Sequence, residues 1–341
     1  MPESLMAAEV RDIPDAVARL LDRGGPAIRA AARAARALDP PVIATVARGS
    51  SDHACTYLKY CAELLLGLPV ASIGPSVASI YKVHLRLRRA LALAVSQSGE
   101  SPDIHVLATA ARAGGALTVA ITNHPDSPLG RAADHVLALH AGAERSVAAT
   151  KTFVTSAVAG LALLAHWAED EALLAALAAL PERLARAVRL DWAGLHAALE
   201  GGDSLYVLGR GPSWAMANEA ALKFKEVCLI HAESYSSAEV LHGPVSIVGR
   251  DFPVLALTAA DAAEDSVAEV ADRLAGKGGR VLVTSDRARQ AEALPVIRTD
   301  HPLTDPLALI ATFYANVERI AVGRGIDPDR PRHLSKVTKT V

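Results

Sequence analysis

The sequence predicts an α/β protein built from two tandem domains, each a parallel sheet with helices on both faces. Short apolar strands alternate with helices of ten or more residues through most of the 341-residue chain, which is the pattern of parallel sheets. A strand that closes on Arg-Gly-x-Ser and enters a helix occurs twice, at 42–51 and at 205–213. The length also suits two domains of ordinary size.

Composition narrows the class of protein. Apolar residues make up 51% of the chain and charged residues 21%, which indicates a globular protein. The net charge of −2 argues against nucleic-acid or polybasic membrane partners. The three cysteines form no CxxC pair, so we expect a reducing compartment. With no signal-peptide pattern and no apolar run near the roughly 20 residues of a membrane span, we expect a cytoplasmic protein.

The first domain is expected at 31–185, after a helical lead-in at 1–30. The Ala/Arg-rich helix at 13–38 is expected to break at Gly24-Gly25. The predicted strands lie at 42–47, 90–95 and 117–121, with a helix at 101–112 between the last two.

The second domain is expected at 195–325 and repeats this order. An Ala/Leu-rich helical stretch at 155–200 leads to a turn at Gly201-Gly202-Asp203. Strands follow at 205–209, 252–258 and 280–284, with a helix at 265–275. The remaining residues, 326–341, form a C-terminal tail.

The turn Ser96-Gln97-Ser98-Gly99-Glu100-Ser101 follows a buried strand and is rich in hydroxyl groups. Ser101 suits the N-cap of the next helix and Pro102 its first position. The free N–H groups and positive end of that helix, with three serines, favour a phosphate. The absence of lysine from the turn points to a small phosphorylated metabolite. An ordinary Ser/Gly-rich connection is the alternative.

Dinucleotide and metal sites are not predicted. The turn at 209–214 lacks the third glycine of a dinucleotide-binding loop, and no phosphate loop ending in Gly-Lys-Ser/Thr occurs. The closest histidines, His135 and His140, are expected on one strand at an odd spacing, facing opposite sides. We therefore expect no metal and no cofactor.

A second group of chemical interest lies in residues 218–244. Glu219, Lys223 and Glu226 fall on one helix face, so two carboxylates flank an ammonium group. A solvated salt-bridge stripe is the simple interpretation, but the apolar neighbours favour a partly buried Glu226 able to act as acid or base. His242 precedes Gly-Pro in a constrained turn and is either structural or a proton-transfer group.

The tail has the composition of a disordered segment from 327 onward. Lys336, among small and apolar neighbours, offers the alternative of a buried amine.

Four motifs in order resemble a known family. The turn at 96–101, Ser146-Val147-Ala148-Ala149-Thr150-Lys151, the 219–244 segment and the tail at 332–336 resemble the isomerase half of glucosamine-6-phosphate synthase. That half is a tandem pair of sugar isomerase (SIS) domains, and the resemblance covers the chain from about residue 30. It implies a flavodoxin-like three-layer fold, a homodimer with a shared active site, and a hexose or hexosamine 6-phosphate as ligand.

The resemblance also implies roles for individual residues. Glu226 corresponds to the acid/base that moves a proton between C1 and C2, and His242 to the ring-opening histidine contributed across the dimer interface. Lys336 corresponds to the tail lysine that reaches the open-chain sugar, and Lys223 to a lysine that positions the site. The expected phosphate and sugar contacts are Ser51, Ser96, Gln97, Ser98, Ser101 and Val147.

Two departures from the synthase bear on activity. The sequence contains no glutaminase domain with its N-terminal cysteine, so we expect no ammonia production from glutamine. Ala149 stands where the synthase has serine, which removes a hydroxyl group from the sugar pocket. The ending at 336–340 resembles that of SIS-type glucosamine-6-phosphate deaminases.

The sequence therefore predicts an enzyme that converts glucosamine 6-phosphate and water to fructose 6-phosphate and ammonia. A fructosamine-6-phosphate deglycase and an aminating isomerase without its own glutaminase domain share the same residues and stay open. A non-catalytic sugar-phosphate sensor is the alternative of another class.

Overall fold

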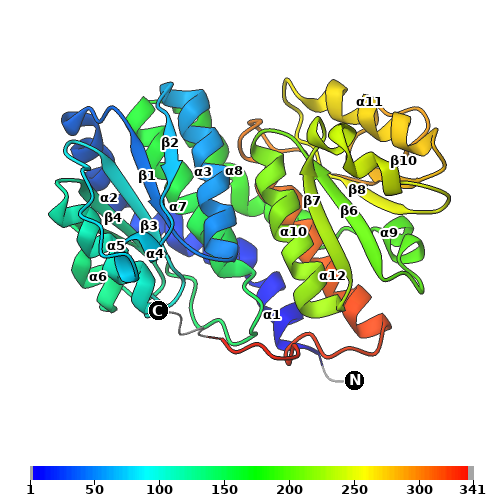
Figure 1. Cartoon of the computed structure of the whole chain (residues 1–341), viewed down its shortest axis with the longest axis horizontal. Helices are drawn as coiled ribbons and strands as arrows, with labels where there is room; N and C mark the ends of the chain where they lie inside the picture. Colours follow the sequence, from blue (N-terminus) through cyan, green and yellow to red (C-terminus); the bar gives the residue numbers. More distant parts are fainter. Residues whose placement is uncertain (1–2, 337–341) are drawn as a thin grey trace. The chain divides into compact units, whose positions relative to one another are not determined.

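The computed structural model describes residues 3–336, which form two compact units (Figure 1). The N-terminal unit comprises residues 12–145, 151–178 and 334–336. The C-terminal unit comprises residues 3–11, 146–150 and 179–333. Each unit is described by itself below.

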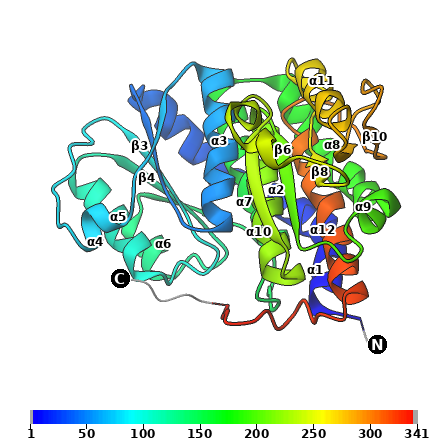
Figure 2. The same ribbon diagram turned by 45° about the vertical axis from the view of Figure 1, so that its right-hand side comes forward.

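The N-terminal unit is a five-stranded, fully parallel sheet in the order β2-β1-β3-β4-β5. Helices α2, α3 and α7 pack together on one face, and α5 packs with α4 and α6 on the other (Figure 2). The strands are β1 (Ile43–Val46), β2 (Val70–Ser72), β3 (Leu91–Val95), β4 (Leu117–Thr122) and β5 (His135–Ala138). The helices are α2 (Ile13–Leu38), α3 (Ser50–Leu66), α4 (Ser76–Ser79), α5 (Pro102–Ala113), α6 (Pro128–Ala132) and α7 (Lys151–Ala168).

The C-terminal unit has a second parallel sheet, β10-β9-β8-β6-β7, whose order relative to the chain is the same as in the first. Its strands are β6 (Ser204–Gly209), β7 (His231–Ser236), β8 (Pro253–Ala256), β9 (Arg280–Val283) and β10 (Glu292–Ala293). Its helices are α1 (Leu5–Arg11), α9 (Ala193–Ala198), α10 (Pro212–Cys228), α11 (Glu264–Ala275) and α12 (Asp305–Gly323), with 3-10 turns η1 (Glu239–His242) and η2 (Pro244–Ile247). Helix α8 (Glu171–Ala187) contributes residues to both units. The predicted α/β fold with two parallel sheets is confirmed.

The two Arg-Gly-x-Ser turns have the same backbone conformation. Gly49 precedes α3 with φ 56° and ψ −134°, and Gly211 precedes α10 with φ 58° and ψ −139°. No atom lies within 4 Å of a Cβ placed at either position, so the positive φ is what requires glycine there. The predicted duplication therefore extends to the backbone geometry of this turn.

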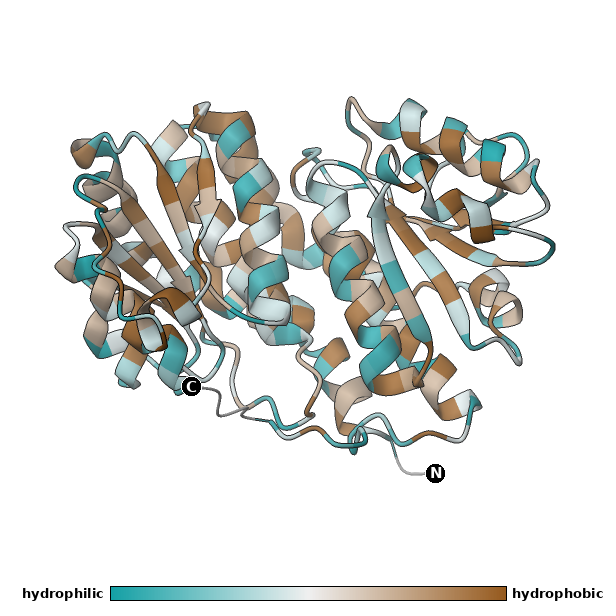
Figure 3. Cartoon of the chain, viewed as in Figure 1, coloured by the Kyte–Doolittle hydropathy of each residue, from teal (hydrophilic) through white to brown (hydrophobic). Residues whose placement is uncertain are grey.

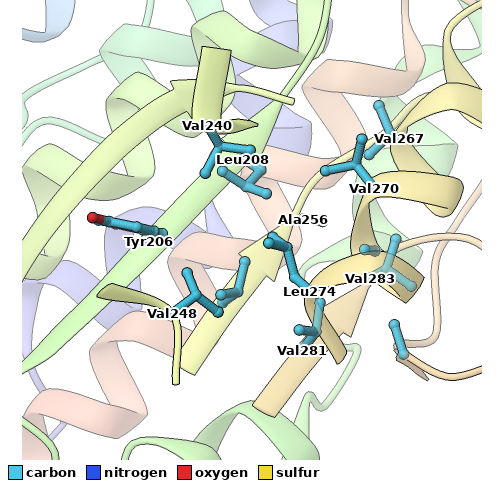
Figure 4. Close-up of a cluster of buried hydrophobic side chains, with 13 residues drawn as sticks. Tyr206, Leu208, Val240, Val248, Ala256, Val267, Val270, Leu274, Val281 and Val283 are labelled. Atoms are coloured by element: carbon cyan, nitrogen blue, oxygen red, sulfur yellow. The ribbon is translucent and has the colours of Figure 1, made fainter. Parts of the chain in front are cut away.

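Apolar residues predominate along the central strands of both sheets, β1 and β3 in the first and β6 and β8 in the second (Figure 3). In the C-terminal unit, Leu208 and Ala256 from the sheet lie in one buried cluster with Val267, Val270 and Leu274 of α11 (Figure 4). Full burial of each large aliphatic side chain contributes about 1.5–3 kcal/mol. This packing fixes α11 against the sheet of the C-terminal unit.

Two local expectations are wrong. Helix α2 runs unbroken through Gly24 and Gly25, because its packing against α7 and β5 outweighs the weak helix propensity of glycine. A Cβ at Gly24 would meet Leu20 Cδ1 at 3.1 Å, which explains the small residue. His140 lies beyond the end of β5 with φ 49°, so strand alternation does not relate it to His135.

Between residues 3 and 336, none of the helices combines the length and the apolar character needed to span a bilayer.

Candidate active site

The hydroxyl-rich turn after β3 is organised by its own serines. Ser96 Oγ accepts a hydrogen bond from the Gly99 N–H at 3.1 Å, and Ser98 Oγ accepts one from the Glu100 N–H at 3.2 Å. Gly99 has φ 65°, and a Cβ there would lie 2.0 Å from Ser127 Oγ. The turn is therefore fixed as a compact loop that admits no side chain at Gly99.

Ser101 occupies the N-cap position of α5, as predicted, and Pro102 is the first helical residue. The Ser101 side chain makes no capping hydrogen bond. The Ile104 and His105 N–H groups of the first turn donate to the Ser101 carbonyl oxygen, each at 3.2 Å, so it is the Ser101 hydroxyl group that stays available to an anion at this helix end.

This turn lies at the topological switch point of the N-terminal sheet. Strand order reverses between β1 and β3, and in open α/β sheets ligands bind outside the carboxyl ends of the strands at this point. Ser96, Gln97 and Ser98 follow β3 directly, and Ser51 lies in the first turn of α3, after β1. The structure thus brings the predicted phosphate contacts to one sheet edge.

The equivalent edge of the C-terminal sheet is filled by its own charges. The Asp305 carboxylate accepts hydrogen bonds from the Ala260 N–H at 2.8 Å and the Thr299 N–H at 2.6 Å. Arg298 donates to the carbonyl oxygens of Thr258 and Thr284, each at 2.9 Å. The loop after β8 is thus already bonded to a buried carboxylate of its own unit, and we take the turn after β3 as the candidate for an external phosphate.

The carboxylates on α10 bracket a buried ammonium group, as the spacing predicts. Lys223 Nζ lies 3.1 Å from Glu219 Oε1 and 2.6 Å from Glu226 Oε2. The Tyr314 hydroxyl group on α12 also donates to Glu219 at 2.9 Å. Burial alone would lower the pKa of Lys223, but Glu219 and Glu226 outweigh burial and raise that pKa above its ordinary value.

The two carboxylates differ in exposure. The Glu219 side chain is fully buried, whereas 21% of the Glu226 side chain is exposed near the C-terminal end of α10. The expectation of a partly buried Glu226 at a helix end is confirmed. Lys223 fixes one Glu226 oxygen, so the side chain is held in place while still accessible to a ligand.

His242 ends η1 and is exposed. Gly243 follows with φ 147°, and the Tyr206 hydroxyl group donates to the Pro244 carbonyl oxygen at 3.1 Å. The constrained turn is confirmed: the exposed His242 precedes a glycine at positive φ and a Pro244 carbonyl that Tyr206 holds.

The tail is not disordered over its described part. Lys336 Nζ forms an ion pair with Glu144 Oε2 at 2.9 Å, and the Glu144 side chain is fully buried. Glu144 also accepts hydrogen bonds from the Thr152 N–H at 3.0 Å and hydroxyl group at 2.5 Å. Upstream, Asp329 accepts from the Leu5 and Met6 N–H groups that begin α1. These contacts fix a segment whose composition suggested disorder, while 337–340 lies outside the described residues.

Glu144 is a functional candidate that the sequence reasoning missed. It lies two residues before the 146–151 motif and forms an ion pair with Lys336, the lysine expected to reach the open-chain sugar. The signal was a lone carboxylate ahead of a small-residue run, which is too common to interpret without the fold.

Val147 lies in the segment 146–150, which belongs to the C-terminal unit. Glu9 of α1 accepts a hydrogen bond from the Ser146 N–H at 3.3 Å, which fixes the start of this segment. The structure therefore places the predicted residues in two sets. Ser51, Ser96, Gln97, Ser98, Ser101 and Lys336 belong to the N-terminal unit, and Val147, Lys223, Glu226 and His242 belong to the C-terminal unit.

The cysteines are buried thiols. Burial raises the pKa of Cys55 and Cys61, and raises that of Cys228 to about 12. Such thiols stay protonated at neutral pH and are weak nucleophiles. Within residues 3–336, no group of three or more His, Cys, Asp or Glu side chains is arranged to hold a metal ion.

Comparison with known proteins agrees with this architecture. The SIS domain model matches residues 39–166 and 199–292. The glutamine–fructose-6-phosphate aminotransferase (isomerizing) of Symbiobacterium thermophilum is 36% identical over 314 residues, covering 86% of this chain and 51% of the relative. The chain thus spans about half the length of the curated relatives it matches.

Solved structures extend the comparison. A Silicibacter pomeroyi protein assigned as a phosphosugar isomerase is 60% identical, with a TM-score of 0.93 over 96% of this chain and all of that one. A glucosamine-6-phosphate deaminase from Thermotoga maritima has the same fold, with a TM-score of 0.80 at 20% identity over 99% of this chain and all of that one. The chain therefore belongs to the SIS domain family.

Proposed function

We propose that the protein is a cytoplasmic amino-sugar-phosphate deaminase of the isomerase type. It converts glucosamine 6-phosphate and water to fructose 6-phosphate and ammonia by proton transfer between C2 and C1. The observation that carries this proposal is Glu226, partly exposed and bound at 2.6 Å to the buried ammonium group of Lys223. The identity to isomerizing aminotransferases supports the choice of amino sugar phosphates.

The phosphate group binds the turn at 96–101 with the nearby Ser51. Donors there include the serine hydroxyl groups, which lie at the positive N-terminal end of α5. The phosphate is remote from C1 and C2, so its binding energy can be used to hold the reacting carbons in place.

The proton transfer uses Glu226. After His242 has moved a proton to open the ring, the Glu226 carboxylate takes the proton from C2 of the aldehyde form. As O1 takes up a proton from water, the electrons move to give an enol between C1 and C2 with the amine still on C2. Return of the proton from Glu226 to C1 then yields the protonated imine of fructose 6-phosphate at C2. Lys223 keeps Glu226 oriented for the first transfer through the contact at 2.6 Å.

Release of ammonia completes the reaction. Water adds to the C2 imine, and the resulting carbinolamine expels ammonia to leave the C2 carbonyl. Lys336 can take the same position as water and form a Schiff base at C2, which water then hydrolyses. Each step is a proton transfer or an addition to an activated carbon.

A second candidate is the reverse, aminating reaction. The Symbiobacterium thermophilum relative is an isomerizing aminotransferase, which favours this direction with ammonia supplied from elsewhere. The same side chains serve both reactions. Comparing the turnover number for deamination of glucosamine 6-phosphate with that for amination of fructose 6-phosphate tells the two candidates apart.

The test is release of ammonia and fructose 6-phosphate from glucosamine 6-phosphate by the purified chain. We expect equal amounts of both products, and a fall of at least about 1000-fold in turnover for Glu226→Gln with binding retained. Glu269→Gln, an exposed carboxylate on α11 of the same unit, is the matched control and should keep full turnover. Full turnover in Glu226→Gln would overturn the assignment.

We also propose that a homodimer shares its active sites, with His242 acting in the site of the partner. Mixing inactive Glu226→Gln with inactive His242→Asn protein, under conditions of subunit exchange, should then restore activity, because one site of each mixed dimer is intact. No recovery in a mixture shown to exchange subunits would contradict this arrangement.

A further inference from the structure

Arg48 lies beside the phosphate turn across the switch point. It follows β1 by two residues, and β1 pairs with β3 in the register Val46↔Ala94. Continuing that register places Arg48 level with Ser96, the first residue of the turn. The two chain segments therefore leave the sheet at the same edge.

An ion pair fixes the Arg48 side chain at this edge. Its Nε pairs with Asp103 Oδ2, and the Asp103 side chain is fully buried. Asp103 is the second residue of α5, the helix that Ser101 caps. The pair thus joins the turn after β1 to the first turn of the helix that would receive the phosphate.

The remaining donors of Arg48 are available to a ligand. The side chain is 47% exposed, and Nε carries its only hydrogen bond to residues 3–336. Both Nη groups stay free of described partners, and guanidinium binds phosphate oxygens in a bidentate manner. The turn itself contains no lysine. Arg48 also offsets the buried charge of Asp103, which would otherwise repel an anion at this helix end.

The second Arg-Gly-x-Ser turn has an arginine at the position equivalent to Arg48, but its side chain has different contacts. Arg210 follows β6 as Arg48 follows β1, but its Nη1 donates to the hydroxyl group of Ser266 on α11 at 3.3 Å. Among residues 3–336 no carboxylate pairs with Arg210, and the loop after β8 is already bonded to the buried Asp305 carboxylate. The fold keeps the arginine in both halves, and of the two it is Arg48 whose described partner is a buried carboxylate.

We propose that Arg48, oriented by Asp103, is a phosphate-binding residue that selects phosphorylated over unphosphorylated sugars. The identity of the sugar in this inference rests on the proposed function, whereas the binding of a phosphate group by Arg48 does not. A charge-assisted bidentate contact predicts a loss of about 10- to 100-fold in affinity when lysine replaces the guanidinium group.

The experiment measures the Kd of fructose 6-phosphate and of inorganic phosphate by calorimetry for the full chain. The variants are Arg48→Lys, Arg48→Gln and the matched control Arg210→Lys. We expect both Arg48 variants to bind both ligands more weakly than wild type. The loss should be smaller for Arg48→Lys than for Arg48→Gln, and the control should equal wild type. In turnover, KM should rise in the Arg48 variants while kcat changes less than threefold.

Three outcomes would overturn the inference. One is wild-type Kd in Arg48→Gln together with a lower Tm, which would make the ion pair purely structural. The second is an equal loss in Arg210→Lys, and the third is no binding of either ligand by wild type. Failure of the proposed reaction is distinguishable, because it appears as absent ammonia release while the Kd difference between wild type and Arg48→Lys persists.

Discussion

Replacement of Lys223 by methionine tests whether the ion pairs of Glu219, Lys223 and Glu226 on α10 stabilise the fold. The substitution keeps the shape of the side chain but removes the charge that lies 3.1 Å from Glu219 and 2.6 Å from Glu226. Glu219 is fully buried and keeps the Tyr314 hydroxyl group as a donor, which does not neutralise its charge. Removing one partner of a buried ion pair costs about 3–5 kcal/mol.

The matched variants separate charge from packing. Lys225→Met changes an exposed lysine on the same helix and should alter the free energy of unfolding by less than about 0.5 kcal/mol. The double variant Lys223→Met/Glu219→Gln removes both charges and should recover most of the loss, because a buried pair replaced by neutral groups of similar volume is often close to neutral.

The assay is urea unfolding at pH 7 in a Trp167→Phe background, so that the tryptophan fluorescence reports on Trp192 and Trp214 of the C-terminal unit. The reasoning would be refuted if Lys223→Met cost less than about 1 kcal/mol, as expected for a surface lysine. It would also be refuted if the double variant were less stable than the single one.

The pH dependence follows from the raised pKa of Lys223. A group whose folded pKa exceeds the ordinary value of 10.5 contributes stability below that value and loses it as pH rises through the folded pKa. The stability difference between wild type and Lys223→Met should therefore stay constant from pH 6 to 9 and shrink only above about 10.5.

Further predictions concern the N-terminal unit. Gly99→Ala should weaken fructose 6-phosphate binding at least about 10-fold because of the clash with Ser127, whereas Gly67→Ala, at the same φ of 65° in open space, should only lower stability by about 1–2 kcal/mol. Burial by itself would raise the pKa of Asp12, but hydrogen bonds from Arg19 and Lys151 outweigh burial and lower that pKa below 3.8. The ionised Asp12 therefore stabilises the fold, and this stabilisation is lost as pH falls below 3.8. In the Asp12→Asn variant, the free energy of unfolding should lack this acid-dependent loss. Lys336→Met should reduce turnover at least about 100-fold with KM little changed, and equal kcat would assign the lysine to structure alone.

The fold follows from local sequence patterns, which is why its class and strand positions were predictable. Parallel strands buried on both faces appear as short apolar runs, and β3 and β4 start or end within a residue of the expected bounds. The continuity of α2 was not predictable, because it depends on packing against α7 rather than on Gly24 and Gly25 themselves.

The site is predictable only where its parts are close in sequence. Glu219, Lys223 and Glu226 share one helix face, so their spacing alone indicates the ion-pair cluster. The partner of Lys336 is Glu144, which lies 192 positions away, and no local pattern relates them. The same is true of Tyr314, which contacts Glu219 from a different helix.

The proton transfer between C1 and C2 is the central claim, and hydrogen exchange tests it most directly. Wild type and Glu226→Gln are incubated with fructose 6-phosphate and ammonia in deuterated buffer, and deuterium at C1 is followed by NMR. We predict that wild type introduces deuterium at C1 and that Glu226→Gln binds the sugar without doing so. Binding by wild type with no exchange, or equal exchange in the variant, would contradict the account.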